Sequence, residues 1–413
     1  MDFGSNAFIL ICAALVFLMT PGLAFFYGGL TRRKNVINTM AACGAIMGVT
    51  VVLWILIGFS LSFGADHGGI IGGFEYICLN GLDFETALDY APSLSSLTYV
   101  VFQMMFAMIT AGILTGSVAG RMKFKALFFF IILWSFAVYY PLAHMVWGAD
   151  GFLASIGSVD FAGGNVVHIS SGVSGLVLAL LLGRRRGVEH APYRPHNVPY
   201  VFLGAGLLWF GWFGFNAGSA LEANGLAAHA FTTTAVASAT AMLVWMLLDV
   251  IKTGKPTLVG ISTGLVAGLV AITPGAGYVP VWSAFIIGAV VSPLCFFGIS
   301  LLKQKLKIDD ALDAFGCHGI GGIWGGIATG LFARSDINSV AQWDGLVFGD
   351  VNLFLAQLAG IGISIAVAVV GTLICAGIVR IFTKLRVEPK EELIGMDTTQ
   401  HGENAYPSFN GLD

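Results

Sequence analysis

Long apolar segments fill most of this chain and limit what it can fold into. Eleven are long enough to cross a hydrocarbon layer of about 30 Å, and they lie near residues 7–30, 36–62, 96–119, 126–146, 163–183, 198–218, 226–250, 257–275, 280–302, 315–332 and 353–382. Hydrophobic residues make up 57% of the chain and charged residues only 10%, whereas a soluble globular domain carries about a quarter charged residues. We therefore predict an all-α polytopic membrane protein with eleven transmembrane helices.

The basic residues indicate how these helices are oriented. With the N-terminus outside, the inner connections are 31–35, 120–125, 184–197, 251–256 and 303–314, followed by the C-terminal tail. Nineteen of the 20 Lys and Arg lie in or beside these stretches, and Arg334 is the exception. Cytoplasmic loops carry an excess of Lys and Arg, and the outer loop at 64–95 holds five acidic residues but no basic one. The predicted topology is N-out and C-in.

The cysteines and the N-terminus add little to this picture. Five of the six cysteines lie inside apolar segments, where cysteine commonly packs as a small hydrophobe, and Cys78 has no partner in its loop. The first residues lack the basic region of a signal peptide. We predict no disulfide framework, no metal site and no cofactor.

Two histidines sit in matching surroundings 150 positions apart. Asp160 precedes His168 by eight residues, and Asp310 precedes His318 by the same distance. Small residues follow each histidine at the third, fourth and seventh positions, namely Ser171, Gly172 and Gly175 in one segment and Gly321, Gly322 and Gly325 in the other. These offsets share one helix face, so each helix is able to pack closely against a neighbour there. An ionisable residue in an apolar segment is costly and often functional.

The 150-residue offset indicates an inverted repeat. Five helices separate the two histidine segments, so the segments cross the membrane in opposite directions. We expect repeat halves at about 7–183 and 198–332, with the helix at 353–382 as an addition. Eight helical residues rise about 12 Å, which places both imidazoles near the midplane, within hydrogen-bonding distance. The alternative is two unrelated buried histidines, each bonded to a local carbonyl. The transmembrane domain is assigned to 1–382 and a cytoplasmic tail to 383–413.

Five local motifs resemble the ammonium transporter family, which also includes the methylammonium permeases and Rhesus proteins. They are PGLAFFYGG at 21–29, DFAGGNVVHISSGVSG at 160–175, WFGFNAGS at 212–219, DAFGCHG at 313–319 and GMDTTQHGENAY at 395–406. They occur in the family's order, and the resemblance is closest to prokaryotic members. One departure is Met396, where the family tail usually has Leu. The resemblance implies a homotrimer with one pore per subunit in the plasma (inner) membrane.

The resemblance also assigns roles along a pore. Phe106, Trp147 and Ser219 match an outer recruitment site, where aromatic faces attract a cation and a hydroxyl oxygen accepts a hydrogen bond. Phe106 and Phe215 match a stacked pair that closes the pore below that site. Trp212 matches an aromatic residue beside the pore-lining pair His168 and His318. From its position alone, Trp147 suits an interfacial aromatic belt better than a binding site.

Asp160 matches the family's essential acid. As a carboxylate at the start of its helix, it is placed to accept hydrogen bonds from the free N–H groups of Gly163 and Gly164. This capping role would make it a structural residue. Direct contact with the substrate is the alternative.

The function implied is transport of ammonium, and of methylammonium, through a hydrophobic pore. Ammonium is able to leave a proton behind and cross as ammonia, whereas potassium has no proton to lose. A dry lumen makes passage of the charged form costly. The family reading adds that the proton also crosses, so that transport is electrogenic. A cytoplasmic PII-type regulatory protein is the implied partner, besides the bilayer and the other subunits; nucleic acid is not. We found no enzyme motif, and the alternative function is an ammonium receptor that signals without conducting.

Overall fold

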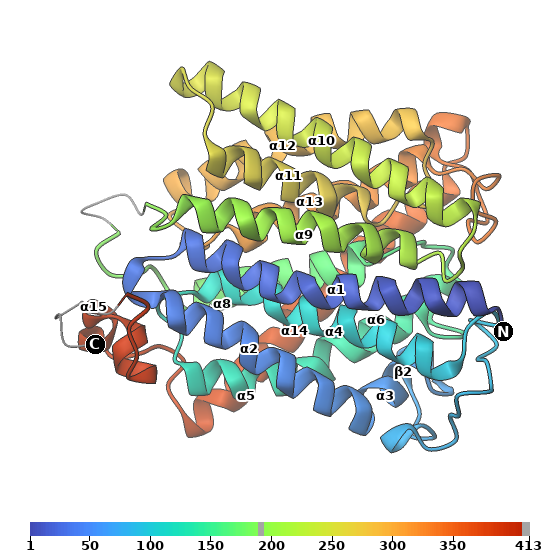
Figure 1. Ribbon diagram of the computed structural model, residues 1–413, viewed down its shortest axis with the longest axis horizontal. Coiled ribbons are helices and arrows are strands. Elements are labelled where there is room, and N and C mark those ends of the chain that lie inside the picture. Colours follow the sequence, from blue (N-terminus) through green and yellow to red (C-terminus); the bar gives the residue numbers. More distant parts are fainter. Residues whose placement is uncertain (189–193, 407–413) are drawn as a thin grey trace.

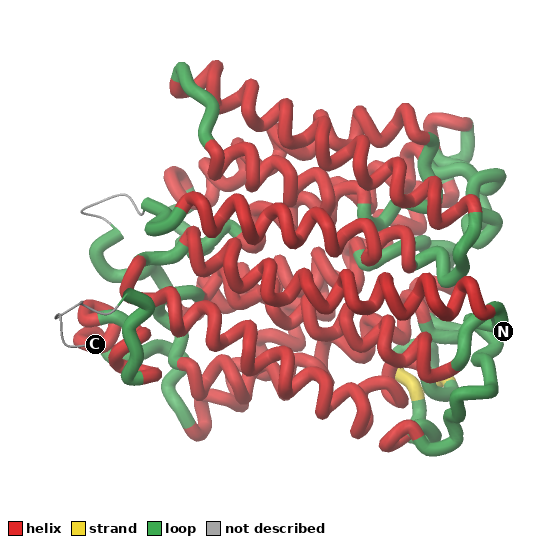
Figure 2. Tube along the Cα trace, viewed as in Figure 1, coloured by secondary structure: helices red, strands yellow, loops and turns green. Residues whose placement is uncertain are grey.

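The computed structural model describes residues 1–188 and 194–406, and they form a bundle of long helices lying side by side (Figures 1 and 2). The α-helices are α1 (Phe3–Leu30), α2 (Val36–Leu53), α3 (Phe59–Phe63), α4 (Ser96–Val118), α5 (Phe124–Trp134), α6 (Tyr140–Trp147), α7 (Phe152–Ser155), α8 (Ser170–Leu182), α9 (Val198–Gly218), α10 (Gly225–Thr253), α11 (Leu258–Ile272), α12 (Val281–Ser300), α13 (Ile320–Phe332), α14 (Asn352–Phe382) and α15 (Pro389–Ile394). Two short antiparallel strands, β1 (Asp66–His67) and β2 (Ile71–Gly72), form a hairpin in the loop after α3.

Short turns of other helix types join or extend several of these elements. Three are 3₁₀ turns, namely η1 (Arg33–Asn35), η3 (Ile77–Leu79) and η8 (Leu346–Phe348). Six are π-helical turns, namely η2 (Trp54–Gly58), η4 (Ser135–Tyr139), η5 (Gly164–Ile169), η6 (Leu301–Lys305), η7 (Phe315–Gly319) and η9 (Asp397–His401). Such turns often mark functional positions in helices, and η5 and η7 each contain one of the two histidines singled out in the sequence.

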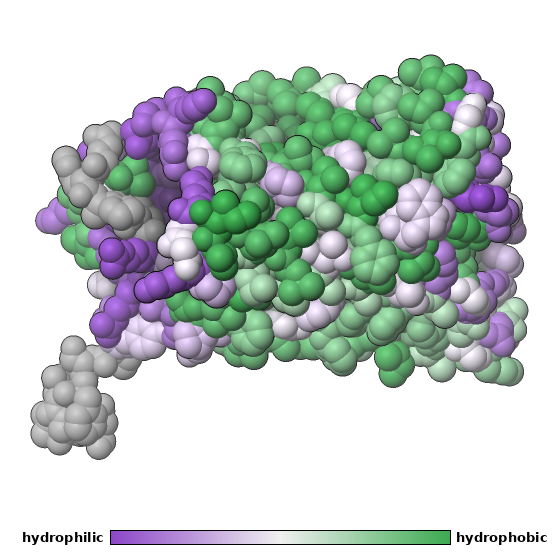
Figure 3. All heavy atoms as spheres, turned by 90° about the horizontal axis from the view of Figure 1, so that it is seen from above, coloured by the Kyte–Doolittle hydropathy of each residue, from purple (hydrophilic) through white to green (hydrophobic). Residues whose placement is uncertain are grey.

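Nine helices in the described residues are long and apolar enough to cross a membrane. The sequence predicts two further crossings, at 257–275 and 315–332. The structure has the 15-residue α11 at the first, and η7 followed by α13 at the second. The outer surface fits this assignment, because Figure 3 shows an apolar belt between two hydrophilic ends. Apolar side chains such as Phe210 and Val370 are more than half exposed on it. The chain is therefore a multi-pass helical membrane protein.

Close packing of α1 against α9 depends on glycines. A Cβ atom on Gly29 would lie 2.6 Å from the backbone nitrogen of Val201, and one on Gly204 would lie 2.2 Å from that of Phe26. Real Cβ atoms do not come so close, so only glycine allows the two backbones this approach. Small residues at the contacts of membrane helices serve this purpose, since lipid offers no hydrophobic drive for helix association.

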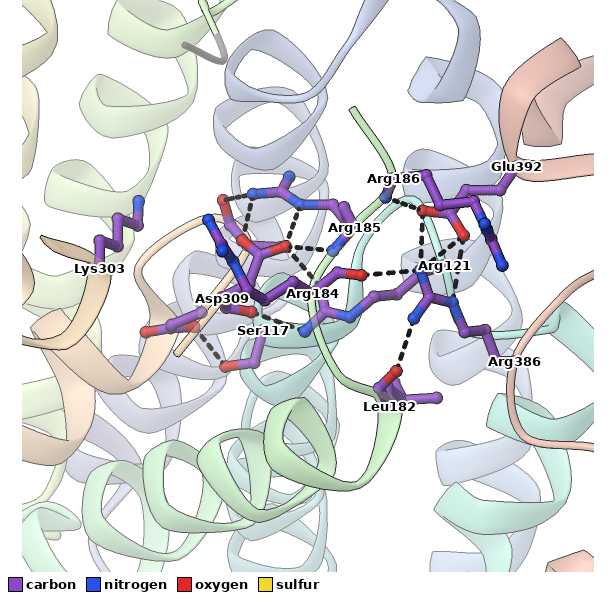
Figure 4. Close-up of polar contacts among 12 residues, drawn as sticks. Ser117, Arg121, Leu182, Arg184, Arg185, Arg186, Lys303, Asp309, Arg386 and Glu392 are labelled. Carbon is purple, nitrogen blue, oxygen red and sulfur yellow. Dashed lines mark hydrogen bonds and ion pairs between the residues drawn. The ribbon is translucent and has the colours of Figure 1, made fainter. Parts of the chain in front are cut away.

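A buried charge network ties three connections together at the end of the bundle where α15 lies (Figures 1 and 4). Arg185 holds Asp309 with two side-chain hydrogen bonds of 2.7 and 2.8 Å, a bidentate geometry that suits guanidinium and carboxylate. Arg121, which is fully buried, donates to the backbone carbonyl of Asp309 at 2.6 Å. Burial opposes ionisation of Asp309, but Arg185 and Arg121 together hold its pKa well below the usual range.

The segment after α14 folds back onto this network (Figure 4). Arg386 pairs with the buried carboxylate of Glu392 at 2.8 Å, and it also donates to the carbonyl oxygens of Leu182 and Arg184. Farther along, the backbone nitrogen of Asn38 donates to Asp397 at 2.9 Å. The described part of the C-terminal segment is thus fastened to the ends of α2 and α8 by specific hydrogen bonds.

Candidate functional site

A cavity of about 280 Å³ opens at the end of the bundle opposite α15, where α4, α6 and the loop after α7 meet. Its wall contains Phe106, Trp147 and Ser219, the three residues that the sequence assigns to an outer recruitment site, and also Asp160. The walls are aromatic, with hydroxyl, carbonyl and amide groups between the rings. The cavity has the size and lining of a binding site for a small polar or cationic ligand.

Hydrogen bonds fix the two polar members of this wall. The indole nitrogen of Trp147 donates to the backbone carbonyl of Asp160 at 2.9 Å, which holds the ring at the cavity. The hydroxyl of Ser219 donates to the carbonyl of Phe215 at 2.9 Å. Because its hydrogen is used there, the oxygen of Ser219 presents only lone pairs to an occupant. The site therefore offers a cation an aromatic face and an acceptor.

A stacked pair of phenyl rings closes the inner end of the cavity. The rings of Phe106 and Phe215 lie 4.1 Å apart between centroids at an interplanar angle of 22°. Both side chains are buried, and Phe106 also meets Trp147 edge to face at 5.9 Å. No open passage leads between two rings at this separation. The pair therefore separates the cavity from the space beyond it.

Beyond the phenyl pair lies the histidine pair. The Nδ1 atoms of His168 and His318 are 3.2 Å apart, so one of them carries the shared hydrogen and the other accepts it. Both rings are buried, and the Nε2 atom of His168 has no hydrogen-bond partner within the described protein. The pair can hold one proton between the rings, while a second would set two N–H groups against each other.

The space beside the histidines is narrow and apolar. It measures about 10 Å³ and is lined by Met19, Leu23, Ile109, Ile113, Val167, Leu208, Trp212 and Phe215 together with the two histidines. A void of this size holds about one water molecule, and apart from the imidazoles its walls offer no polar group to which a water molecule could hydrogen-bond. Desolvation of a charged solute there would be costly.

Trp212 forms one wall of this space. Its ring stacks on His168 with centroids 5.3 Å apart at 23°, and its indole nitrogen donates to the hydroxyl of Thr273 at 2.9 Å. Thr273 is fully buried, and its hydroxyl donates a hydrogen bond to the carbonyl of Leu269. The role of Thr273 is absent from the sequence interpretation, because a threonine inside an apolar segment gives no signal of its long-range partner.

Asp160 shapes the start of the helix that carries His168. Its carboxylate accepts hydrogen bonds from the backbone nitrogens of Gly163, Gly164 and Asn165 at 2.8, 2.6 and 2.7 Å, and from that of Val166 at 3.4 Å. A helix start leaves such N–H groups without partners, and a negative charge there is favourable. Asp160 also lines the cavity, but both of its oxygens are already used as acceptors within its own loop.

Asp310 occupies the matching position ahead of His318 and is bound differently. One oxygen accepts from the backbone nitrogen of Gly316 at 3.0 Å and the other from the hydroxyl of Ser117 at 2.7 Å. The side chain of Asp310 is buried, with 1% of its surface exposed. A buried carboxylate thus precedes each histidine, but the second is partly satisfied by a side chain of α4.

The small residues after each histidine meet the opposite segment. A Cβ atom on Gly172 would lie 2.4 Å from the nitrogen of Gly319, directly after His318, and one on Gly322 would lie 3.0 Å from the Cβ of His168. The two contacts are reciprocal: Gly172, four residues after His168, meets the turn that carries His318, and Gly322, four residues after His318, meets the turn that carries His168. Larger side chains at either position would separate the two imidazoles.

The structure brings the predicted site residues together, and five of them form a row. From the cavity inward the row contains Trp147, Phe106, Phe215, His168 and His318, with ring-centroid distances of 5.9, 4.1, 6.2 and 5.2 Å between successive members. Trp212 flanks it, and Ser219 and Asp160 lie at its outer end. Within the described residues no group of three or more His, Cys, Asp or Glu could hold a metal ion.

The chain is similar to known proteins along nearly its whole length. A family model described as Ammonium Transporter Family matches residues 7–406. The chain is 47% identical to an ammonium transporter of Bacillus subtilis over 98% of this chain and 99% of that protein. It is 45% identical to ammonium transporter Amt1 of Archaeoglobus fulgidus over 98% and 100%.

Solved structures with the same fold include proteins of two described kinds. Mep2 of Saccharomyces cerevisiae superposes with a TM-score of 0.91 at 36% identity, covering 100% of this chain and 93% of that one. A structure described as a sensor Amt protein superposes with a TM-score of 0.87 at 27% identity, covering 96% and 98%.

Proposed function

Because this chain belongs to the ammonium transporter family, we propose that its row of buried rings is the path by which ammonium nitrogen crosses the membrane. The observation that carries the proposal is the histidine pair, buried behind the stacked phenyl rings in an apolar space of about 10 Å³. An ion would have to enter that space without its water. Ammonia, which is neutral and both donates and accepts hydrogen bonds, suits it far better.

The first step takes place in the outer cavity. Ammonium binds against the faces of Trp147 and Phe106 by cation–π attraction, and it donates a hydrogen bond to Ser219. One N–H bond then breaks, its electron pair stays on nitrogen to give ammonia, and the proton passes to a water molecule in the solvent-open cavity. Phe106 and Phe215 open to let the ammonia pass.

The second step takes place along the histidines. Ammonia moves past the paired imidazoles, which offer hydrogen-bond partners in an otherwise apolar space. The proton crosses as well and joins ammonia again on the inner side, so each cycle moves one positive charge. Potassium has no proton to lose and is rejected at the apolar space, even though its size is similar to that of ammonium.

Asp160 acts as a structural acid in this scheme. The four N–H groups that its carboxylate binds belong to the turn that carries His168. The acid thereby sets the position of that turn, and its charge also favours a cation in the adjacent cavity.

The family and the sequence pattern support a proposal for the assembly and topology of the protein. We propose eleven crossings, with the halves 7–183 and 198–332 related as inverted repeats, the N-terminus outside, and one pore in each subunit of a homotrimer in the plasma membrane. The reciprocal contacts of Gly172 and Gly322 support the repeat. The positions of the start of α1 and of α15 at opposite ends of the bundle support an odd number of crossings. A PII-type protein is the proposed partner at the inner face.

Proteoliposomes test the transport function directly. An inward ammonium gradient should generate a current in the parent protein, while an equal potassium gradient should not. The rival function is an ammonium receptor, which the likeness to a sensor Amt protein brings into consideration. Ammonium binding without ammonium-dependent current or uptake would establish the receptor and refute transport.

A further inference from the structure

One buried amide side chain on α14 is hydrogen-bonded at both of its polar atoms. Gln357 lies in the second turn of α14 and is 1% exposed. Its side-chain oxygen accepts hydrogen bonds from the hydroxyl of Ser158 at 2.8 Å and from the backbone nitrogen of Val159 at 2.7 Å. Its side-chain nitrogen donates to the carbonyl of Val159 at 2.9 Å and, at the longer distance of 3.5 Å, to that of Gly326. The amide therefore binds mainly to a two-residue stretch of the loop after α7.

This stretch depends on Gln357 for its backbone hydrogen bonds. Residues 158–160 have no regular secondary structure, and Val159 is 5% exposed. Buried backbone N–H and C=O groups need partners, and Gln357 supplies both of them to Val159. An amide suits the position because it presents an acceptor and a donor side by side.

A glycine allows α14 to approach the loop. Gly360 follows Gln357 by three residues and shares its face of the helix. A Cβ atom on Gly360 would lie 2.5 Å from the hydroxyl oxygen of Ser158, closer than real Cβ atoms come. An element outside the two proposed repeat halves thus packs directly against the loop that leads to Asp160.

The stretch that Gln357 binds leads into the outer site. Val159 and Asp160 both line the outer cavity, and the carbonyl of Asp160 accepts the hydrogen bond from the indole of Trp147 at 2.9 Å. Because Asp160 directly follows Val159, the position of that carbonyl depends on where the amide holds Val159. The contacts therefore run from α14 through the loop to the aromatic wall of the cavity.

The turn that carries His168 has anchors of its own. The backbone nitrogen of Phe161 donates to the carbonyl of Pro274 at 3.0 Å. The carboxylate of Asp160 accepts from the first N–H groups of the turn itself. Neither anchor involves Gln357, so loss of its amide should disturb the outer side of Asp160 more than the histidine pair.

We propose that Gln357 is a positioning residue of the outer site, which holds the carbonyl of Asp160 where the indole of Trp147 donates to it. This role rests on the proposed function, because it takes Trp147 as a residue that recruits ammonium. A ring attracts a cation that lies over its face, so a displaced Trp147 binds ammonium less well. The path beyond the phenyl pair should change less.

A set of variants separates this role from a general contribution to stability. Gln357→Met keeps the length of the side chain and removes the amide. Trp147→Phe keeps an aromatic ring and removes the N–H group that binds Asp160, and a third protein carries both substitutions. The matched control is Thr372→Val, which removes a fully buried hydroxyl from α14. That hydroxyl has no hydrogen-bond partner within the described protein, and it lies about 22 Å along the helix from Gln357.

The measurements are the half-saturating ammonium concentration and the maximal current in proteoliposomes. Gln357→Met should raise the half-saturating concentration about fivefold or more, as expected when much of a cation–π contact is lost, and it should lower the maximal current clearly less. Trp147→Phe should also raise the half-saturating concentration. Adding Gln357→Met to Trp147→Phe should change it little further, because both substitutions remove the same contact. Thr372→Val should match the parent in both quantities.

Several results would overturn the role of Gln357. These are an unchanged half-saturating concentration in an assembled Gln357→Met protein, an equal loss in maximal current, additive effects in the double variant, or an equal shift in Thr372→Val. If Gln357→Met fails to assemble, Gln357→Asn replaces it, since this side chain keeps the amide but is one methylene too short to reach Val159. A parent-like half-saturating concentration in Gln357→Asn then overturns the role.

The parent protein and Trp147→Phe test the proposed function separately. A parent-like value in Trp147→Phe refutes recruitment by Trp147 and, with it, the role of Gln357. A raised value in Trp147→Phe together with a parent-like value in Gln357→Met refutes only Gln357. If the parent binds ammonium but carries no current, transport is refuted, and the comparison is made on ammonium affinities from isothermal titration. Unchanged affinity in Gln357→Met then decides against Gln357, and weakened affinity that is not additive with Trp147→Phe supports it.

Discussion

Replacing Asp160 by alanine should abolish transport and destabilise the protein together. The substitution removes one buried carboxylate and leaves the N–H groups of Gly163, Gly164 and Asn165 without their acceptor, as well as the weaker contact from Val166. An unpaired buried donor costs about 1–3 kcal/mol. Three of them, relieved in part by water entering from the cavity, give a loss of about 3–6 kcal/mol.

The two consequences arise from the same turn. His168 follows the last of these N–H groups by only two residues, so a relaxed turn also moves the imidazole that His318 contacts at 3.2 Å. Asp160→Asn keeps one acceptor oxygen but puts an N–H₂ group against backbone donors. It should therefore be milder than alanine in both stability and transport.

The assay is thermal unfolding of the purified protein in detergent, followed by intrinsic fluorescence, with ammonium current measured on the same preparations. The matched control is Asp336→Ala, because Asp336 is 62% exposed and pairs only with Arg334 on the surface. Such a pair contributes little, so this variant should melt and transport like the parent. An Asp160→Ala protein that is as stable as the parent yet inactive would refute the structural role and indicate contact between Asp160 and the substrate.

Three other perturbations test other parts of the structure. His318→Asp should admit potassium, because a carboxylate in the apolar space stabilises any monovalent cation. His318→Ala should lower ammonium flux without an equal potassium leak. If potassium flux stays at background in a correctly assembled Asp variant, the histidines are not the selectivity element. Asp309→Asn should lower the melting temperature at pH 7, since breaking a buried ion pair costs about 3–5 kcal/mol. The depressed pKa of Asp309 makes this stabilisation complete above the unfolded pKa of about 4 and progressively lost as the pH falls toward the folded value. The difference between parent and variant should therefore shrink below pH 4, and a difference that is constant from pH 7 to 3 would contradict the pairing. Binding of the cognate PII protein should weaken as salt rises, since the inner connections are basic; failure to bind in pull-downs with any nucleotide would count against that partner.

The helical membrane character and the family were predictable from the sequence, because both depend on local patterns. Each apolar segment predicts a membrane helix from its own residues. The motif at 160–175 can likewise be recognised without knowing which segments pack against it. The pairing of His168 with His318 was predicted from spacing, and the structure places the two rings together. Their roles in transport stay a prediction.

Contacts between distant polar residues could not be predicted in this way. The bond from Trp212 to Thr273 joins residues 61 positions apart, and the bond from Arg121 to Asp309 spans 188. Neither has a local signature, since each partner alone reads as an ordinary residue of its segment. The π-helical form of η5 and η7 likewise depends on hydrogen bonds that the spacing of side chains does not reveal.

The Arg121–Asp309 contact also sets a schedule for synthesis of the chain. Arg121 leaves the ribosome 188 residues before Asp309, an interval of roughly 10–40 s at ordinary rates of translation. Throughout that time a side chain that ends fully buried has to remain in contact with water or with a temporary partner. The basic loop at 120–125 therefore cannot form its final buried contacts until most of the second half of the chain has been inserted into the membrane. In a nascent chain halted before Asp309, an arginine-specific reagent should accordingly label Arg121. In the finished protein Arg121 should resist the same reagent.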